Sequence, residues 1–448
     1  MTKKLNSRRS VPVPHRRLSR LGRISAMAMG VAGNMAVNSI AQWATGQRPS
    51  VRDLMLTPSN IYRVTRQLAQ LRGAAMKVGQ LISMDTGDFM PPELAQIMAR
   101  LREDADSMPS SQLKRVLSKQ WPDNWLESFE SFDMRPIAAA SIGQVHRAQL
   151  IGGRDLAIKV QYPGVAESID SDVENIGVLI KLSGLLPKGF KLASYLQEVR
   201  DQLHRETNYT AEAAHLRRFH ALLADAPHFV VPSIHEDWST PSVLAMEYVE
   251  GISIEEVAAF PQQERDQVAR HLIELTLREL FEFGVMQTDP NFANYRYQAG
   301  TRRIVLLDFG ATREIAPSIV DQYRMLMRAG LKNDEVALMD VAQSIGFFGA
   351  QTSAAHRDQI LHMMQLIFKM LTTQEKFQFS DQGIAKQLQS IGFALIEDGF
   401  MPPPLPIEVL LLHRKIGGVF LLCARLSASV DVATLLRAFI KERSDVLE

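Results

Sequence analysis

The sequence predicts an α+β fold of two lobes, a small lobe that mixes strands with helices and a large lobe that is mainly helical, with an added helical extension ahead of both. Apolar side chains recur at three- and four-residue spacing over residues 57–108, and short apolar runs flank glycines over residues 137–160. From Glu255, helical spacing dominates almost to the end. We expect the parts to be residues 1–52, 53–130, 131–250 and 251–448.

The composition is that of an ordinary globular chain. Its 448 residues are 46% hydrophobic and 22% charged, with 26 glycines and 21 prolines. These values exclude collagen-like and wholly disordered chains, and the lone Cys423 excludes a disulfide framework. The length fits two or three domains, and a reducing compartment suits a chain with a single thiol.

Charge is distributed unevenly, although the formal net charge is +1. The first ten basic residues, Lys3 to Arg52, all precede the first acidic residue, Asp53, so the remainder carries 40 basic and 49 acidic residues. A basic tail on an acidic body predicts an anionic partner for the tail, either an anionic lipid or membrane surface or a nucleic acid. No aromatic residue precedes Trp43, so base stacking has no platform and no nucleic acid is expected as a partner.

Residues 24–47 are uncharged and long enough to span a bilayer. Asn34, Asn38 and Gln42 recur at four-residue spacing, however, and would form a polar stripe on one helix face. Two interpretations stay open: a helix that lies in the membrane interface beside the basic tail, or a flexible tail followed by a helix packed on the body.

The first residues also resemble two targeting signals. Ser7-Arg8-Arg9 resembles a twin-arginine export start, but Pro12 and Pro14 follow where an apolar run should begin, so export is not expected. The acid-free start, which contains arginine and serine, also resembles a mitochondrial transit peptide, and this leaves a eukaryotic origin open.

The small lobe has a clear hairpin signal. Gly152-Gly153 separates V-H-R-A-Q-L from D-L-A-I-K-V, which predicts two strands joined by a tight turn. A helical stretch is expected from about Ala193 to Leu223, followed by strands at residues 230–232 and 243–249.

The strongest chemical signal is a pair of segments, Q-T-D-P-N-F-A-N ending at Asn294 and I-V-L-L-D-F-G ending at Gly310. Asp289 and Asn294 are five residues apart, and Asp308 follows an apolar run. This is the spacing of the kinase catalytic loop and D-F-G segment, with Gln-Thr in place of His-Arg. Because Mg²⁺ takes oxygen ligands, we predict that Asn294 and Asp308 hold Mg²⁺. Asp289 would orient the group that attacks the γ-phosphate of ATP.

Lys159 lies in D-L-A-I-K-V, a strand-like run similar to the kinase V-A-I-K, and is predicted to contact the α and β phosphates. Such a lysine needs a glutamate partner, and Glu206 and Glu212 are the candidates. They are six residues apart, so on one regular helix they would point in different directions. We favour Glu212 as the ion-pair partner.

Two further segments complete the kinase order. The segment that would cover the nucleotide carries Ala138, Ala139, Ala140 and Ser141 where glycines are usual, and the Cβ of alanine resists positive φ. V-L-A-M-E-Y-V-E-G resembles a hinge, whose backbone at Glu247 and Val249 would pair with adenine. The alanine-rich loop, the lysine strand, the hinge, the Asp/Asn loop and the D-F-G segment follow one another in the order found in kinases. This order predicts a protein-kinase-like two-lobe fold.

These motifs resemble the UbiB-type atypical kinases, also called the aarF-domain-containing kinase family, from about Leu71 to Leu426. R-G-A-A-M-K-V-G-Q, with Lys77 and Gln80, resembles the K-x-G-Q signature, and A-A-A-S-I-G-Q-V-H resembles the alanine-rich loop. M-Q-T-D-P-N-F-A-N with L-L-D-F-G-A-T-R-E is most similar to the branch that supports coenzyme Q synthesis.

The resemblance implies that the extension, with Lys77 and Gln80, covers the site where a protein substrate would dock, so that members resemble ATPases more than protein kinases. It also implies a role in ubiquinone biosynthesis, with isoprenoid quinone precursors and the biosynthetic proteins as partners. The expected location is cytoplasmic and peripheral at the inner membrane, or on the matrix side of the mitochondrial membrane in a eukaryote.

Two features depart from the family pattern. Glu206-Thr207-Asn208 stands where the family has E-x-D, so a role that needs charge at Asn208, such as tethering Lys77, is expected to be weakened. Many members end in transmembrane helices, whereas the last apolar stretch here is interrupted by charged and polar residues. These are Glu408, His413, Arg414 and Lys415.

The resulting hypothesis is an unorthodox kinase-like ATPase that uses Mg²⁺ and ATP and supports ubiquinone biosynthesis at a membrane surface. Lys159, Glu212 and Asp289 are its catalytic residues. Two alternatives keep the same residues: a pseudokinase that serves as a lipid-binding scaffold, and a protein kinase that acts on a partner. His146 and His413 have no metal-ligand spacing and are expected to be structural.

Overall fold

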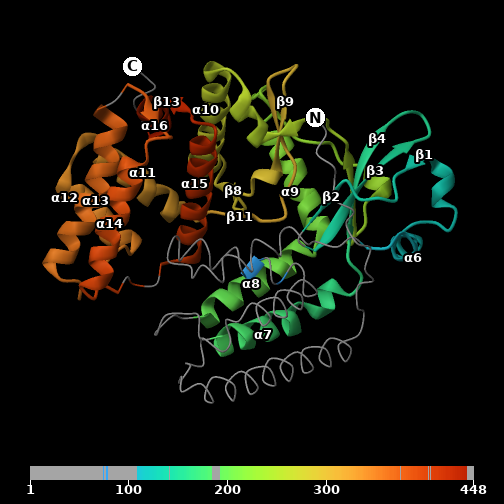
Figure 1. The fold of residues 1–448 in the computed structure, drawn as a ribbon, viewed down its shortest axis with the longest axis horizontal. Coiled ribbons are helices and arrows are strands. Elements are labelled where there is room, and N and C mark those ends of the chain that lie inside the picture. Colours follow the sequence, from blue (N-terminus) through green and yellow to red (C-terminus); the bar gives the residue numbers. More distant parts are fainter. Residues whose placement is uncertain are drawn as a thin grey trace, which may run out of the picture. The chain divides into compact units, whose positions relative to one another are not determined.

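The computed structural model describes residues 108–440, except for Ser141, residues 184–191, Gln374, Pro402 and Pro404, together with Ala74, Lys77 and Val78 (Figure 1). The predictions for the basic tail, the uncharged segment 24–47, Gln80 and Ser141 lie outside the described residues. The chain forms two compact units. The unit with fewer described residues, called the smaller unit below, runs to Arg217 and includes Ser233–Tyr248. The larger unit consists of Arg218–Pro232 and Val249 onward.

The smaller unit is built on an antiparallel sheet with the order β1-β3-β4-β6, and β2 pairs with β3. Its strands are β1 (Phe129–Phe132), β2 (Ala138–Ala139), β3 (Gly143–Leu150), β4 (Asp155–Gln161) and β6 (Val243–Glu247). Its helices are α6 (Ser110–Gln120), α7 (Val165–Ser183), α8 (Leu192–Glu206) and α9 (Tyr209–Leu222), the last of which continues into the larger unit.

The predicted hairpin is confirmed. Strands β3 and β4 pair antiparallel from Gly143 opposite Gln161 to Gln149 opposite Asp155. Gly152 and Gly153 close the turn with φ of +102° and +85°, values that glycine adopts without steric cost.

The helical stretch predicted from Ala193 to Leu223 is confirmed, but it consists of two helices, α8 and α9, because the chain breaks at Thr207 and Asn208. The Thr207 hydroxyl donates to the carbonyl of His204 at the end of α8. The Asn208 Oδ1 accepts the backbone N–H of Ala211 and so caps the start of α9. Short polar side chains of this kind compete with helix continuation.

An aromatic cluster fixes α6 on the sheet. The ring of Trp121 lies 5.0 Å from that of Trp238 and 5.7 Å from that of Phe129, centroid to centroid, and Trp125 lies 5.1 Å from Phe132. Edge-to-face and offset pairs of this geometry add to the free energy gained by burial.

The larger unit combines helices with three small sheets, ordered β5-β10-β9-β7, β8-β11 and β12-β13. The strands are β5 (Phe229–Val230), β7 (Ile252–Ser253), β8 (Val285–Gln287), β9 (Tyr295–Gln298), β10 (Arg303–Leu306), β11 (Thr312–Glu314), β12 (Phe377–Gln378) and β13 (Ser429–Val430). The helices are α10 (Gln262–Arg278), α11 (Pro317–Lys332), α12 (Glu335–Ile345), α13 (Ala354–Thr373), α14 (Gln382–Glu397), α15 (Ile407–Arg425) and α16 (Val432–Ile440).

Close helix packing organises the core of this unit (Figure 1). A Cβ built on Gly330 of α11 would lie 2.2 Å from the ring of Phe368 in α13, so glycine permits the two helices to approach. Helix α10 ends in a π-helical turn at Glu279–Phe283, and Gly284, with φ of +59°, leads into β8. In the described part of the chain, no helix combines the length and apolar character that a membrane crossing requires.

Both singled-out histidines have structural contacts. His146 Nδ1 lies 2.8 Å from the carbonyl oxygen of Asp133, and its Nε2 lies 2.8 Å from the side-chain nitrogen of Gln144. His413 Nε2 lies 2.6 Å from the hydroxyl of Tyr323, and the Phe347 ring stacks on the imidazole at an interplanar angle of 11°. Burial lowers the pKa of His413 to about 4.

Stability should therefore fall in mild acid. An unfolded histidine titrates near pH 6.5, so below this pH the unfolded chain binds a proton that folded His413 does not bind until about pH 4. At pH 5 this proton costs roughly 2 kcal/mol of unfolding free energy relative to pH 8. Urea unfolding at both pH values should show a smaller loss in His413→Gln than in the wild type. The exposed His362→Gln should lose as much as the wild type, and equal losses in all three proteins would contradict the assignment.

Candidate active site

Lys159 and Glu212 form a buried ion pair within the smaller unit. The Nζ of Lys159, on β4, lies 2.7 and 2.9 Å from the two carboxylate oxygens of Glu212, on α9. The side chains are 8% and 2% exposed. The prediction that Glu212 pairs with Lys159 is confirmed. A buried ammonium held by both oxygens of one carboxylate is fixed in position.

Local packing brings α9 to β4. Gly143, at the start of β3, lies so close to β4 that a Cβ there would be 2.3 Å from the carbonyl oxygen of Val160 and 3.1 Å from the hydroxyl of Tyr209. Tyr209 is the first residue of α9, and the Lys159 ammonium lies 5.2 Å from the centre of its ring. Glu212 stands in the first turn, where the helix dipole favours a negative charge.

The alanine-rich segment forms a strand and a turn. Ala138 and Ala139 make up β2, opposite Val145 and Gln144 of β3, and the Ala140 N–H donates to the carbonyl of Gly143 at 2.9 Å. Among the described residues, the only non-glycine positions with positive φ are Arg302, Asn333 and Ser427. The described alanines are therefore held in conformations that suit a Cβ.

The segment predicted as a hinge begins at the end of β6. The backbone N–H of Glu247 donates to the carbonyl of Ser233 at 2.8 Å, and the next N–H, that of Tyr248, donates to the carbonyl of Asp155. Val249 follows as the first residue of the second segment of the larger unit. Hydrogen bonds to two different segments therefore fix the backbone at the end of β6.

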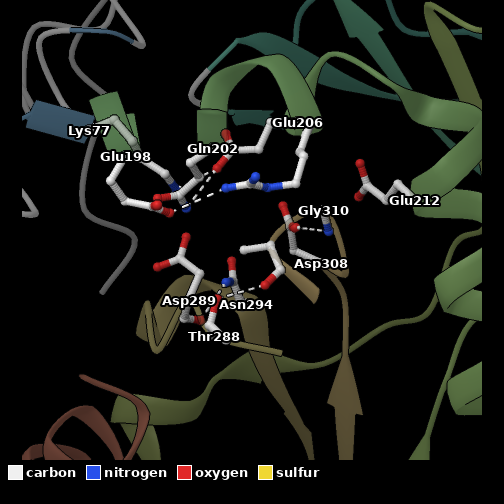
Figure 2. A network of polar contacts seen from close by, with 12 residues as sticks. Lys77, Glu198, Gln202, Glu206, Glu212, Thr288, Asp289, Asn294, Asp308 and Gly310 are labelled. Atoms are coloured by element: carbon white, nitrogen blue, oxygen red, sulfur yellow. Dashed lines mark hydrogen bonds and ion pairs between the residues drawn. The ribbon is translucent and has the colours of Figure 1, made fainter. Parts of the chain in front are cut away.

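Lys77 pairs with Glu206 (Figure 2). The Nζ of Lys77 lies 2.6 Å from a carboxylate oxygen of Glu206, and the side chains are 3% and 10% exposed. The same oxygen accepts a 3.1 Å hydrogen bond from Gln202, and Glu198 pairs with Arg205, so α8 presents a connected polar face here. Glu206 and Glu212 therefore pair with different lysines, because the chain break places them on separate helices, α8 and α9, and their side chains point in different directions.

Asn208 has a local role in this arrangement. Its side chain caps α9, as described above, while Glu206 supplies the charge that pairs with Lys77. Lys77 thus has a carboxylate partner two residues before Asn208.

In the larger unit, Asp289 and Asn294 are held in one loop after β8 (Figure 2). The Thr288 hydroxyl donates to the carbonyl of Ala311 at 2.7 Å, and the Asn294 Nδ2 donates to the carbonyl of Asp289 at 3.1 Å. This fixes the Asn294 amide, whose remaining oxygen is a cation ligand by type.

Asp308 lies next to this loop. The backbone N–H of Leu307 donates to the carbonyl of Asn294 at 3.0 Å, which ties the end of the β10 segment to the Asp289 loop. One carboxylate oxygen of Asp308 accepts the N–H of Gly310 at 2.9 Å. The structure thus brings Asp289, Asn294 and Asp308 together within the larger unit.

Sequence reasoning missed a residue at this site. The Nη2 of Arg414, on α15, lies 3.1 Å from a carboxylate oxygen of Asp289, and the side chains are 5% and 14% exposed. Arg414 had been considered only as an interruption of an apolar stretch. A charged pair inside an otherwise apolar helix was the signal that could have revealed it.

The donor chemistry fits Mg²⁺ with nucleotide. No cluster of three or more histidine, cysteine, aspartate or glutamate side chains suited to a metal occurs among the described residues. Mg²⁺ bound with ATP needs only one or two protein oxygens, because phosphates and water complete its shell. Asn294 and Asp308 match that need.

The buried Lys–Glu pair of a sheet and its neighbouring helix, with the Asp/Asn loop and the D-F-G segment, define the kinase-like class of proteins. The comparisons with known proteins agree. A family model described as the ABC1 atypical kinase-like domain matches residues 100–342. The chain belongs to this family, that of the UbiB-type atypical kinases, and its motifs and membership make it an atypical kinase-like enzyme.

Relatives match along nearly the whole chain. The mitochondrial atypical kinase COQ8 of Saccharomyces cerevisiae is 36% identical over 436 residues, which cover 97% of this chain and 87% of the yeast protein. The mitochondrial atypical kinase COQ8B of Rattus norvegicus is 36% identical over 424 residues, 93% of this chain and 79% of the rat protein. The solved complex of Rv3197 with erythromycin, from Mycobacterium tuberculosis, has a TM-score of 0.60 at 28% identity and covers 85% of this chain and 95% of that one. The predicted α+β, kinase-like fold is confirmed.

The role of Asn208 as a cap gives a direct stability test. Asn208→Ala should lower the free energy of unfolding by about 1 kcal/mol, because the Ala211 N–H loses its acceptor. Asn208→Asp restores the family's acid and also caps well, so its stability should stay within about 0.5 kcal/mol of the wild type. Denaturant unfolding measures both. A large change with Asp and none with Ala would show that charge, not capping, matters at this position.

Proposed function

We propose that this protein is a Mg²⁺- and ATP-dependent, kinase-like ATPase that supports the synthesis of ubiquinone at a membrane surface. The observation that carries the proposal is the buried Lys159–Glu212 pair. Burying two charges costs free energy that a structural role alone repays poorly, whereas a phosphate-binding lysine needs such a fixed carboxylate partner.

Each site residue has a role in this proposal. Lys159 contacts the α and β phosphates, Glu212 orients Lys159, and Asn294 and Asp308 hold Mg²⁺. When bound, the metal ion neutralises charge on the phosphates. Asp289 orients a water molecule or a hydroxyl acceptor for attack on the γ-phosphate. Positioning and electrostatic stabilisation of this kind are the main resources of phosphoryl transfer.

The nucleotide contacts follow the same pattern. The segment from Ala138 to Ser141 lies beside the phosphates without the close backbone wrapping of a glycine-rich loop, and the backbone at Glu247 and Val249 pairs with adenine. The hydrogen bonds of β2, β3 and β6 support this, because they fix the backbone on which these contacts depend.

ATP hydrolysis is favoured over transfer to a protein. Lys77 and Gln80 belong to the segment that covers the protein-substrate site in the family, and the buried pair of Lys77 with Glu206 supports this role for Lys77. A pseudokinase scaffold is the main alternative. The capping role of Asn208 removes one argument for it, since the substitution leaves the Lys77 partner intact.

The cellular role rests on relatives and on charge. The COQ8 relatives are named as mitochondrial atypical kinases. We propose isoprenoid quinone precursors and the proteins of ubiquinone biosynthesis as partners, with a location at the inner membrane. The ten basic residues that precede Asp53 favour contact with anionic lipid.

Replacing the proposed metal ligand tests the chemistry. Asp308→Asn should reduce Mg²⁺-dependent ATP hydrolysis, measured as phosphate release with anionic vesicles present, by at least about 100-fold, because it removes a charged ligand of the cation. The exposed Asp358→Asn on α13 should hydrolyse ATP like the wild type. Undiminished turnover in Asp308→Asn would rule out the metal assignment, and a wild type that binds Mg-ADP without turnover would favour the scaffold.

The ion pair gives a second test. Glu212→Gln removes the carboxylate that neutralises the buried Lys159 ammonium and should cost about 3–5 kcal/mol of unfolding free energy. The double variant Lys159→Met with Glu212→Gln removes both charges, so it should regain most of the lost unfolding free energy. It should not hydrolyse ATP. Arg147→Gln, which breaks the half-exposed pair with Asp155 on the same hairpin, should cost less than about 1 kcal/mol. Normal turnover in the double variant would contradict the role of Lys159.

A further inference from the structure

Helix α15 places two neighbouring cations in the interior of the larger unit. Arg414 and Lys415 are buried, and each faces a carboxylate of another element. Arg414 pairs with Asp289 at 3.1 Å. Lys415 Nζ lies 3.0 Å from a carboxylate oxygen of Glu279, and both of those side chains are 1% exposed.

The Lys415–Glu279 pair also contacts the loop that carries Asp289 and Asn294. The other carboxylate oxygen of Glu279 accepts the N–H of Gln287, the residue two positions before Asp289. Lys415 also donates to the hydroxyl of Tyr295, directly after Asn294. Burial opposes the charge on Lys415, but Glu279 and Tyr295 outweigh it and raise the pKa of Lys415, so the lysine is charged at neutral pH. The pair therefore holds the loop at both of its ends.

Helix α15 also touches the loop directly. A Cβ on Gly418 would lie 2.2 Å from the Cβ of Pro290, so only glycine at this position lets the helix pack on the residue after Asp289. Glu279 itself opens the π-helical turn that ends α10, and such turns are frequent at functional sites.

The hydrogen bonding of Arg414 is specific to Asp289. Its Nη2 donates to the Asp289 carboxylate, while its Nε and Nη1 are buried without a hydrogen-bond partner in the described part of the chain. Unsatisfied buried N–H groups cost free energy. Because the Arg414 guanidinium is buried at this cost while it donates to Asp289, the orientation of the Asp289 carboxylate accounts for its place in the interior.

We propose that Arg414 and Lys415 are positioning residues for Asp289: Arg414 fixes the direction of its carboxylate, and Lys415, through Glu279, fixes the backbone that carries it. The proposal rests on the proposed function, because it assigns Asp289 the role of orienting the attacking group. In this proposal, nucleotide binding does not depend on Arg414.

A double-mutant cycle tests the Arg414 part. Arg414→Gln should lower the rate constant of ATP hydrolysis by about 10- to 100-fold without changing the affinity for Mg-ADP. Arg414→Lys keeps the charge but loses the planar fork, so it should recover little. In an Asp289→Asn background, Arg414→Gln should change the rate less than about twofold, since the two act as a unit. Arg425, the last residue of α15, forms an exposed pair with Glu255 of another element, so Arg425→Gln should hydrolyse ATP at the wild-type rate. The assignment would be overturned if the rate losses of Arg414→Gln and Asp289→Asn were fully additive, or if Arg425→Gln lost as much activity as Arg414→Gln.

Hydrogen exchange tests the positioning independently of turnover. Lys415→Met with Glu279→Gln removes both buried charges yet keeps an acceptor for the Gln287 N–H, so the protein should fold. Peptides that cover residues 284–296 should exchange faster in this variant and in Arg414→Gln than in Arg425→Gln or the wild type. Unchanged exchange would refute the positioning role. A wild type without Mg-ATP turnover would instead refute the proposed function, so the two failures are distinguishable.

Discussion

A charge removed from water must be neutralised nearby, and this requirement orders the polar interior of both units. Lys159 fixes α9 against β4 through Glu212, Lys77 is held at the end of α8 by Glu206, and Lys415 joins α15 to the turn after α10 through Glu279. Loss of one partner from a buried pair typically costs about 3–5 kcal/mol. Because hydrophobic side chains would fill the same space at lower cost, these pairs point to a chemical use.

The strand and motif positions were predictable because their signals are local. The Gly152-Gly153 pair specifies a tight turn through its positive φ, and this sets the register that places Lys159 in the middle of β4. The apolar run before Asp308 and the five-residue spacing of Asp289 and Asn294 are likewise short-range patterns. The prediction that Glu212, and not Glu206, pairs with Lys159 is confirmed, but the two glutamates lie on separate helices and not on one.

Other features depend on packing that no local pattern encodes. The break at Thr207 and Asn208 interrupts a sequence with continuous helical spacing, and it turns Glu206 and Glu212 toward different lysines. Arg414 follows Asp289 by 125 residues, so its pairing arises only when α15 packs against the loop. The π-helical turn at Glu279–Phe283 was not predicted for the same reason. Helix α7 was also not predicted, although its buried residues recur at three- and four-residue spacing.

Covalent labelling with an ATP acyl phosphate, which transfers its acyl group to a lysine held near the nucleotide phosphates, tests the central claim most directly. The account predicts that peptide mass spectrometry finds Lys159 modified, that excess Mg-ADP prevents the modification, and that Asp308→Asn weakens this protection. Labelling confined to exposed lysines such as Lys332, with no effect of Mg-ADP, would contradict a nucleotide site at Lys159.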